Sequence, residues 1–272
     1  MIRLDNISLI FNQGTPDENE AIKNISLTVN PGDFITVIGS NGAGKTSLYN
    51  AVAGTYPLSS GRIFIGGEQG ERDITREPEF MRARYIGRIF QNPLLGTAGR
   101  MSLEDNMTIC AKKGYRGLNI SLNRQTRNQF RAALAELGMG LEHRLTDNVE
   151  LFSGGQRQAL TLLMTVMSRP SLLLLDEHTA ALDPRNAELV MALTLRFATE
   201  YHLTVMMITH NMKDALETGS RLLMMDEGEI IMDIGAEEKA KLTTAGLIQR
   251  FRDIKKKELT NDELLLANGA GL

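Results

Sequence analysis

A glycine-rich segment, Gly39 to Thr46, has residue types at a spacing that can bind phosphate. It fits the pattern G-x-x-x-x-G-K-[ST], in which glycines let backbone N–H groups turn onto an anion. Lys45 would place a point charge against the β- and γ-phosphates, and Thr46 would give its hydroxyl to Mg²⁺. The expected nucleotide contacts are Gly39, Ser40, Asn41, Gly42, Ala43, Gly44, Lys45, Thr46 and Ser47.

The segments that flank these glycines support a nucleotide site over a simple glycine-rich turn. Phe34 to Ile38 is an apolar run typical of a short buried strand, and Thr46 to Ala53 has the pattern of a helix. The N-terminus of that helix would add partial positive charge beside the phosphates. The order strand, glycine loop, helix therefore predicts an α/β fold with the site at the strand end.

Two acidic pairs compete for the role of a metal-binding and water-activating site. Asp176 and Glu177 follow four leucines, and Asp226 and Glu227 follow Leu222 to Met225. The second pair continues into Gly228, which predicts a β-hairpin turn with solvated acids. The first pair ends a run typical of a buried parallel strand, so it would reach the carboxyl edge of the sheet, where ligands bind. We therefore expect Asp176 to contact the metal and Glu177 to activate water.

A second anion-binding surface is predicted at Ser153, Gly154, Gly155 and Gln156. Ser153 is placed as the N-cap of a helix that continues from Arg157 to Met167. A helix that opens with Ser-Gly-Gly exposes N–H groups and a hydroxyl with little side-chain bulk. A plain turn and cap is the alternative, and the position just upstream of the Asp-Glu strand favours the anion site.

Composition places these motifs in an ordinary globular chain. The chain has 272 residues, 42% hydrophobic and 23% charged, and a formal net charge of -3, which argues against a general nucleic-acid surface. Cys110 is the single cysteine, so no internal disulfide is expected. No apolar run approaches the roughly 18 to 20 residues that span a bilayer, and no signal peptide is apparent. Any membrane span would belong to another chain.

In the order of its motifs the chain resembles the ATP-binding subunits of ABC transporters, and the resemblance covers about residues 1–235. The motifs are the nucleotide loop, Gln91, Ser153 to Gln156, Leu172 to Glu177, Ala181-Leu182-Asp183 and Thr209-His210. The resemblance implies an α/β fold of the P-loop NTPase class and ABC type. It has a mixed sheet core, an antiparallel β subdomain and a helical subdomain at about 92–165. Residues 236–272 would form a short helical extension.

The resemblance also implies roles for further residues. Phe11 stands where an aromatic ring stacks on adenine, and Gln91 would contact the metal or the water and report nucleotide state to a permease. His210, after the apolar strand Val205 to Ile208, would contact the γ-phosphate and support Glu177. The catalytic set is thus Glu177, His210, Lys45 and Gln91, and the metal set is Thr46, Gln91 and Asp176. ATP and Mg²⁺ are the implied ligands.

In the resembled family two such domains pair head to tail. ATP held by Lys45 of one copy is then capped by Ser153 and Gly155 of the other, with Asp183 close to the same nucleotide. The implied partners are a second copy or a similar ATPase subunit, a membrane permease and a separate solute-binding protein, with no nucleic acid. The implied location is the cytoplasmic face of the cell membrane, with the chain peripheral through the permease.

The chain departs from the usual pattern at Phe152, where Leu is usual, and at His178, where Pro is usual. His178 could perturb the pKa of Glu177, could titrate near neutrality, or could simply be tolerated. Residues 176–184 look like those of bacterial importer ATPases, some linked to aromatic amino acid uptake. Beyond residue 236, a basic helix at 245–257 and a capping-box pattern at 260–263 predict a solvated extension, with a dimer contact as the alternative.

Other ATPases with the same nucleotide head fit less well. DNA-repair and chromosome ATPases separate the two anion sites by long coiled coils, whereas Lys45 and Ser153 are only 108 residues apart. Translation-factor ATPases carry two heads in one chain, and this chain has one set of motifs. A cytosolic assembly ATPase remains as the alternative to solute transport.

Overall fold

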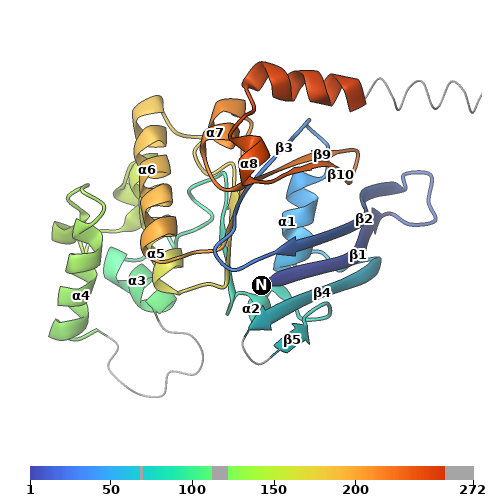
Figure 1. Cartoon of the computed structure of the whole chain (residues 1–272). Coiled ribbons are helices and arrows are strands. Elements are labelled where there is room, and N and C mark those ends of the chain that lie inside the picture. Colours follow the sequence, from blue (N-terminus) through green and yellow to red (C-terminus); the bar gives the residue numbers. More distant parts are fainter. Residues whose placement is uncertain (68–69, 112–121, 255–272) are drawn as a thin grey trace, which may run out of the picture.

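The computed structural model describes residues 1–67, 70–111 and 122–254, which form both strands and helices (Figure 1). The strands are β1 Ile2–Phe11, β2 Asn19–Val29, β3 Phe34–Gly39, β4 Ser60–Gly67, β5 Gly70–Asp73, β6 Ile86–Ile89, β7 Leu172–Asp176, β8 Val205–Ile208, β9 Arg221–Asp226 and β10 Glu229–Ile234. The helices are α1 Lys45–Ala53, α2 Glu79–Arg82, α3 Leu103–Ala111, α4 Arg124–Ala135, α5 Gly154–Met167, α6 Pro184–Glu200, α7 Met212–Glu217 and α8 Ala236–Lys239. Short 3-10 turns occur at Leu141–His143 and Val149–Leu151.

A six-stranded mixed sheet forms the centre, in the order β10-β9-β3-β8-β7-β6. Its strands are parallel except for the β9–β10 hairpin, whose turn follows Asp226 as predicted. The alternating side chains of β7 show how the sheet is covered on both faces. Leu172 and Leu174 enter one apolar cluster, and Leu173 and Leu175 enter another on the opposite face. Burial on both faces explains why this strand reads as a continuous leucine run.

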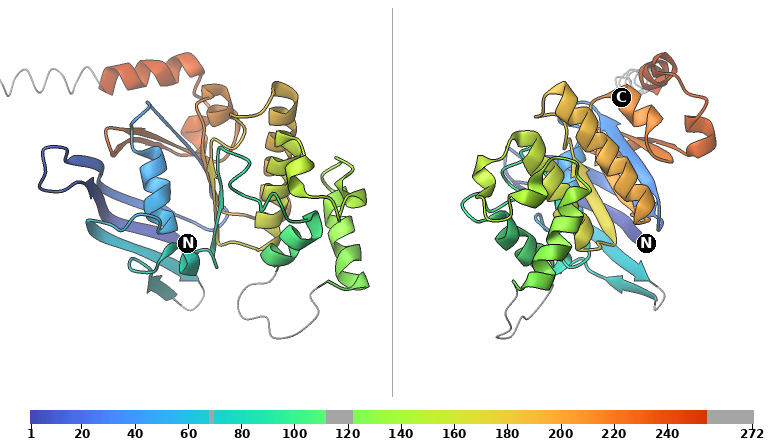
Figure 2. Two further views of the ribbon diagram at one scale, coloured as in Figure 1. Left: turned by 180° about the vertical axis from the view of Figure 1, so that it is seen from behind. Right: turned by 90° about the vertical axis from the view of Figure 1, so that its left-hand side faces the viewer.

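The two faces of this sheet carry different layers. On one side lie α1 and a four-stranded antiparallel sheet of order β2-β1-β4-β5, whose apolar residues share a cluster with α1. On the other side α5 and α6 pack on the sheet, with α3 and α4 beyond them (Figure 2). The expected mixed sheet, antiparallel β part and helical part are therefore confirmed.

Local signals set the helix boundaries close to those predicted. Ser102 caps α3 by accepting the N–H of Asp105, and Phe130, Leu134 and Leu137 form a buried stripe on and after α4. The polar segment after Phe11 ends where β2 begins, at Asn19. No helix in the part of the chain that the structure describes is long and apolar enough to cross a membrane.

The C-terminal extension packs on the core, so the expectation of a solvated extension is wrong for its described part. Residues 244–254 form a helix, and Leu247 on it is fully buried beside Ile38, Leu222 and Met224. The ammonium of Lys239 is also buried, where it donates to the Thr218 and Gly219 carbonyls, and burial lowers its pKa to about 8. The capping-box pattern at 260–263 lies outside the described residues.

Candidate nucleotide site

The glycine loop between β3 and α1 contains two positions that only glycine can occupy without strain. Gly44 has φ +93°, and a Cβ at this position would lie 2.5 Å from the Ala21 carbonyl oxygen. A Cβ at Gly39 would lie 2.2 Å from the Met225 carbonyl oxygen. Neither position can hold a larger residue without a backbone shift, so the predicted glycines are needed for the loop to fit between β9 and β2.

Lys45 is held in place by its own loop. Its Nζ donates to the Gly39 carbonyl at 2.9 Å and to the Ser40 carbonyl at 2.8 Å. Burial lowers the pKa of Lys45, and the nearby carboxylates of Glu177 and Asp176 partly oppose that shift. The ammonium group of Lys45 is therefore partly desolvated and held in a fixed orientation.

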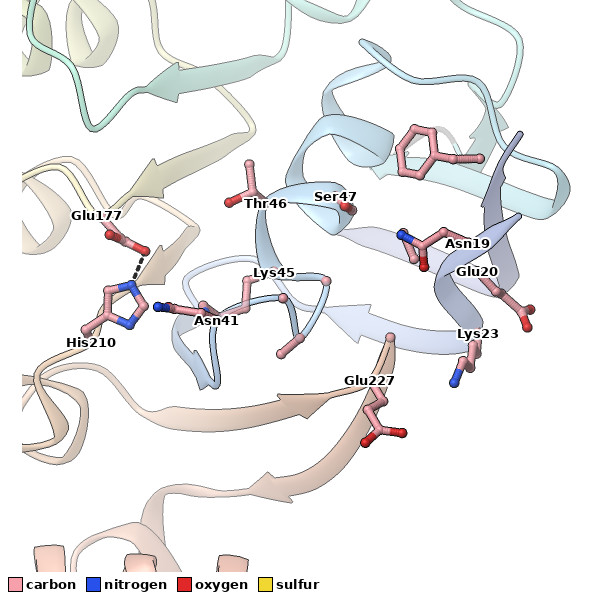
Figure 3. A pocket seen from close by; sticks show the side chains of 16 residues that line it. Asn19, Glu20, Lys23, Asn41, Lys45, Thr46, Ser47, Glu177, His210 and Glu227 are labelled. Atoms are coloured by element: carbon pink, nitrogen blue, oxygen red, sulfur yellow. Dashed lines mark ion pairs between the residues drawn. The ribbon is translucent and has the colours of Figure 1, made fainter. Parts of the chain in front are cut away.

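A cleft of about 540 Å³ lies over the glycine loop (Figure 3). Figure 3 shows Glu177 and His210 at one end, Lys45 and Thr46 in the middle, and Asn19, Glu20 and Lys23 at the other end. The predicted site residues that line it are Phe11, Asn41, Gly42, Ala43, Gly44, Lys45, Thr46, Ser47, Glu177 and His210. The ring of Phe11 is braced edge-on by Tyr56, with centroids 5.3 Å apart. The residues predicted to bind phosphate and to stack on adenine thus line the same cleft.

Glu177 and His210 meet at the phosphate end of this cleft. They follow the neighbouring parallel strands β7 and β8, and His210 Nε2 forms an ion-pair contact with Glu177 Oε1. Glu177 has φ +47°, a left-handed conformation that is unfavourable for a residue with a Cβ. Its N–H donates to the Ile208 carbonyl at 3.2 Å. This turn takes Glu177 out of the strand direction and places its carboxylate on the cleft.

Asp176 lies behind Glu177 and is 8% exposed. Its Oδ2 is 3.5 Å from Arg88 Nη2, and Arg88 Nη1 donates to Asn50 Oδ1 on α1 at 2.6 Å. Burial raises the pKa of Asp176, and the Arg88 guanidinium opposes that shift. Arg88 therefore offsets part of the cost of burying this carboxylate next to the glycine loop.

The oxygen groups at this end suit Mg²⁺ that arrives with a nucleotide. Mg²⁺ is usually held by one or two carboxylates together with substrate phosphates and water. The hydroxyl of Thr46 and the carboxylate of Asp176 provide such donors. Among the described residues, no group of three or more His, Cys, Asp or Glu could hold a metal by itself. The residues present thus fit a metal shared with phosphate, not a metal held by protein alone.

Several predicted site residues lie outside the lining of this cleft. These are Gly39, Ser40, Gln91, Ser153, Gly154, Gly155, Gln156, Asp176 and Asp183. Ser153 forms the predicted N-cap of α5 as a full capping box, with reciprocal bonds to Gln156. Asp183 is the N-cap of α6 and accepts the N–H of Asn186 at 3.2 Å. The two predicted anion sites thus lie on separate parts of the same chain.

One expectation about an individual residue is wrong, and one of the alternatives for another is excluded. Asp226 was expected as a solvated turn residue, but it is 6% exposed and its Oδ1 accepts the hydroxyl of Ser40 at 3.0 Å. The hairpin turn therefore packs against the nucleotide loop. His178 does not titrate near neutrality, because burial lowers its pKa to about 4. Its ring contacts Thr194 on α6 at 3.0 Å and points away from the cleft.

Sequence analysis missed Arg88 and Gln158. Arg88 sits inside the apolar strand β6, and Gln158 sits on the buried face of α5, where it is completely buried. A charged or amide side chain in an apolar element is the signal that could have identified both, because such groups need specific polar partners. The partners themselves are distant in sequence.

Known proteins resemble the chain in both sequence and fold. The family model described as "ABC transporter" matches residues 22–180, more than half of the chain. A "Tyrosine transport ATP-binding protein" of Clostridioides difficile is 36% identical, over 92% of this chain and 98% of that protein. The "Phosphonates import ATP-binding protein PhnC" of Lactobacillus delbrueckii is 30% identical, over 86% and 89% of the two chains.

Solved structures show the same fold. The cbiO1 protein of Clostridium perfringens, described as part of an ABC transporter complex, superposes with a TM-score of 0.72 at 24% identity and covers 94% of this chain and 98% of that one. A dimeric structure of the ATP-binding cassette MJ0796 bound to ADP and Pi gives a TM-score of 0.71 at 23% identity, over 87% and 99% of the chains. Together with the site geometry, these matches show that the chain belongs to the ABC transporter family and is one of its ATP-hydrolysing, nucleotide-binding cassettes.

Proposed function

We propose that this cassette powers solute transport through a separate membrane-spanning permease, and that it works as a head-to-tail dimer. One observation carries the dimer: the cleft contains Lys45, Glu177 and His210 but none of the residues 153–156. Ser153 and Gly154 are exposed at the start of α5. Two exposed phosphate-binding surfaces that do not meet within one chain can meet across two copies.

In this arrangement ATP held by Lys45 of one copy is covered by Ser153 and Gly155 of the other. The N-terminus of α5 offers free N–H groups and a partial positive charge. A Cβ at Gly155 would lie 2.5 Å from the Asn186 side chain, so α5 and α6 approach too closely here for a larger residue. Gly155 is buried against α6, while Ser153 and Gly154 beside it remain exposed. Asp183, at the start of α6, lies on the neighbouring helix end.

The residues support in-line attack of water on the γ-phosphorus. The water oxygen forms a bond to phosphorus, the bond from phosphorus to the bridging oxygen of ADP breaks, and Glu177 accepts the proton of the water. His210 orients Glu177, and Lys45 holds the phosphate oxygens. When bound at Thr46 and Asp176, with Gln91 as the third predicted ligand, Mg²⁺ supplies charge that offsets the phosphate oxygens.

An exposed apolar surface close to Gln91 is suited to the permease. Leu94 is 57% exposed and Leu95 is 64% exposed, and Ile109 on α3 is also exposed. Asn106 on α3 ties the two segments together, because it accepts the N–H of Ala98 at 2.8 Å and donates to the Ala98 carbonyl at 3.1 Å. A permease segment bound to this surface would contact the Gln91 loop and α3 together. The chain would then lie at the cytoplasmic face of the membrane.

Transport of an aromatic amino acid is the reaction that one relative supports. The relative with 36% identity is named for tyrosine transport and the PhnC relative for phosphonate import. The match to the first relative covers nearly the whole of both chains. An importer of this kind would also need a separate solute-binding protein. The net charge of -3 gives no support for a nucleic-acid partner.

Uptake in a host strain that lacks this chain tests the proposal. Uptake of labelled tyrosine, phenylalanine or tryptophan should fall, and it should return with the wild-type chain but not with Lys45→Ala. Lys213→Ala serves as the matched control, because this lysine is exposed on α7 and forms only a surface pair with Glu217. Unchanged uptake of all three amino acids would reject the solute. A purified chain that hydrolyses ATP but never co-purifies with a membrane protein would instead favour the cytosolic alternative.

A further inference from the structure

Gln158 is a completely buried amide on the helix that begins with the second phosphate-binding surface. It lies five residues after Ser153 on α5, among buried apolar neighbours such as Ala159 and Leu162. A buried carboxamide is unfavourable unless it is hydrogen-bonded, and methionine would fill the same space without that cost. The amide must therefore be explained by its partners.

The partners are two backbone carbonyls from two different loops. Gln158 Nε2 donates to the His178 carbonyl at 2.7 Å and to the Phe90 carbonyl at 3.1 Å. Two carbonyl acceptors require the NH₂ group at this end of the amide, which fixes its orientation. One acceptor belongs to the peptide that precedes Gln91, and the other lies one residue after Glu177. A single side chain thus joins α5 to both loops that carry predicted catalytic residues.

The segment after β7 also contacts α6, through the side chain of His178. His178 Nε2 lies 3.0 Å from the Thr194 hydroxyl, and that hydroxyl donates to the Val190 carbonyl at 2.8 Å. Because the hydroxyl hydrogen of Thr194 is donated to the Val190 carbonyl, the His178 ring must be the donor to the Thr194 oxygen. The backbone around the left-handed Glu177 is therefore held by α5 through Gln158 and by α6 through the His178 ring.

We infer that Gln158 is a positioning residue. Through its two hydrogen bonds, the position of helix α5 determines the positions of the loops that carry Gln91 and Glu177. A shift of α5 when a second copy closes on the nucleotide would move both carbonyls together with the amide. The two catalytic loops would then reach working geometry only when α5 is correctly placed. This inference rests on the proposed dimer and on the proposed roles of Gln91 and Glu177.

The test compares Gln158→Met with Thr161→Val in the purified full-length chain. Methionine keeps the length of the side chain and removes both N–H donors. Thr161 is a buried residue of the same helix, and its hydroxyl donates only to the Arg157 carbonyl within α5, so it is a matched control. We expect Gln158→Met to lower kcat at least about tenfold with the KM for ATP nearly unchanged, because misplaced catalytic groups slow the chemical step. Thr161→Val should keep both constants.

A double-mutant cycle with Gln91→Ala separates positioning from a general loss of packing. If Gln158 acts through the Gln91 loop, Gln158→Met should cost less in kcat when Gln91 is already alanine than when it is present. Fully additive losses, or a wild-type kcat in Gln158→Met, would overturn the inference. Failure of the proposed function would look different. In that case Glu177→Gln would turn over normally, whatever the behaviour of Gln158→Met.

Discussion

The carboxylate of Glu177 contacts Nε2 of His210 where the neighbouring parallel strands β7 and β8 end. The contact depends on the left-handed backbone of Glu177, which is fixed by its hydrogen bond to Ile208. It joins a group able to take a proton from water to a group able to hold it in place. Both side chains border the cleft that contains Lys45.

Substitution Glu177→Gln should keep ATP binding but lower hydrolysis by about 10²-fold or more, because an amide cannot accept the proton from water. The variant should also accumulate an ATP-bound dimer, since closure would no longer be followed by hydrolysis. Size-exclusion chromatography with ATP and Mg²⁺ checks the dimer, and phosphate release checks the rate. Turnover close to wild type with the permease present would remove Glu177 from this role.

Substitution Phe11→Ala should weaken ATP binding by about 1 to 3 kcal/mol, the range measured for bases stacked on aromatic rings. The ring has no hydrogen-bonding group, so GTP should be affected to a similar extent. Titration of a fluorescent ATP analogue measures the affinity. Tyr56→Leu is the matched control, because Tyr56 only braces the Phe11 ring edge-on and lies outside the lining of the cleft. Equal affinity of Phe11→Ala and wild type would place adenine elsewhere, with residues 12–20 as the next candidates.

The Ser153 surface should act on the nucleotide of a second copy. A Ser153→Arg chain should bind ATP yet fail to dimerise or hydrolyse it. Mixed with Lys45→Ala, it should recover part of the activity, since one of the two composite sites then carries neither change. The stricter measurement is a cross-link between cysteines at the exposed positions Asn41 and Leu151, in a Cys110→Ser background. Cross-links that form only within one chain, with ATP and Mg²⁺ present, would exclude the arrangement in trans.

Because His178 is buried, the free energy of unfolding should depend on pH. Its pKa is lowered to about 4, against an ordinary value of about 6.5, so the unfolded chain binds a proton that the folded chain does not. The stabilisation is complete above about pH 6.5 and is lost as the pH falls toward 4, by up to about 3 kcal/mol. His178→Gln keeps a donor for Thr194 and should flatten this dependence. Urea unfolding at about pH 7.5 and about pH 4.5 measures it, and parallel curves for the two proteins would contradict it.

The exposed leucines after Gln91 should matter only when the permease is present. The double substitution Leu94→Ser and Leu95→Ser should leave the ATPase activity of the isolated chain within about twofold of wild type, as for other exposed positions. Stimulation by the permease should fall strongly. Tyr201→Ser, at the far end of α6 and 46% exposed, is the control. Full stimulation of the double variant would place the permease on another surface.

The predictable parts of this site are those encoded by neighbouring residues. The glycine loop, the leucine strand that ends at Asp176 and the cap at Ser153 each occupy a short segment whose spacing determines its shape. Gln158 could not be interpreted in that way, because its acceptors lie 68 and 20 residues away. Asp226 was misplaced for a related reason: hairpin rules predict its turn but not that Ser40, 186 residues away, packs against it. In both cases the environment of the side chain depends on contacts with residues far away in the sequence.

The capping box at Ser153 also determines which kinds of atom this helix end can bind. The Ser153 hydroxyl accepts the N–H of Gln156 at 3.2 Å, and the Ser153 N–H is taken by Gln156 Oε1 at 3.1 Å. The hydroxyl hydrogen and the N–H groups of Gly154 and Gly155 take no part in these two bonds, so the first turn offers more donors than acceptors. A group made only of acceptor oxygens, such as a terminal phosphate, matches these donors, whereas an ammonium does not. Residues 153–156 alone therefore give this helix end its preference for acceptor groups, whether or not a second copy is bound.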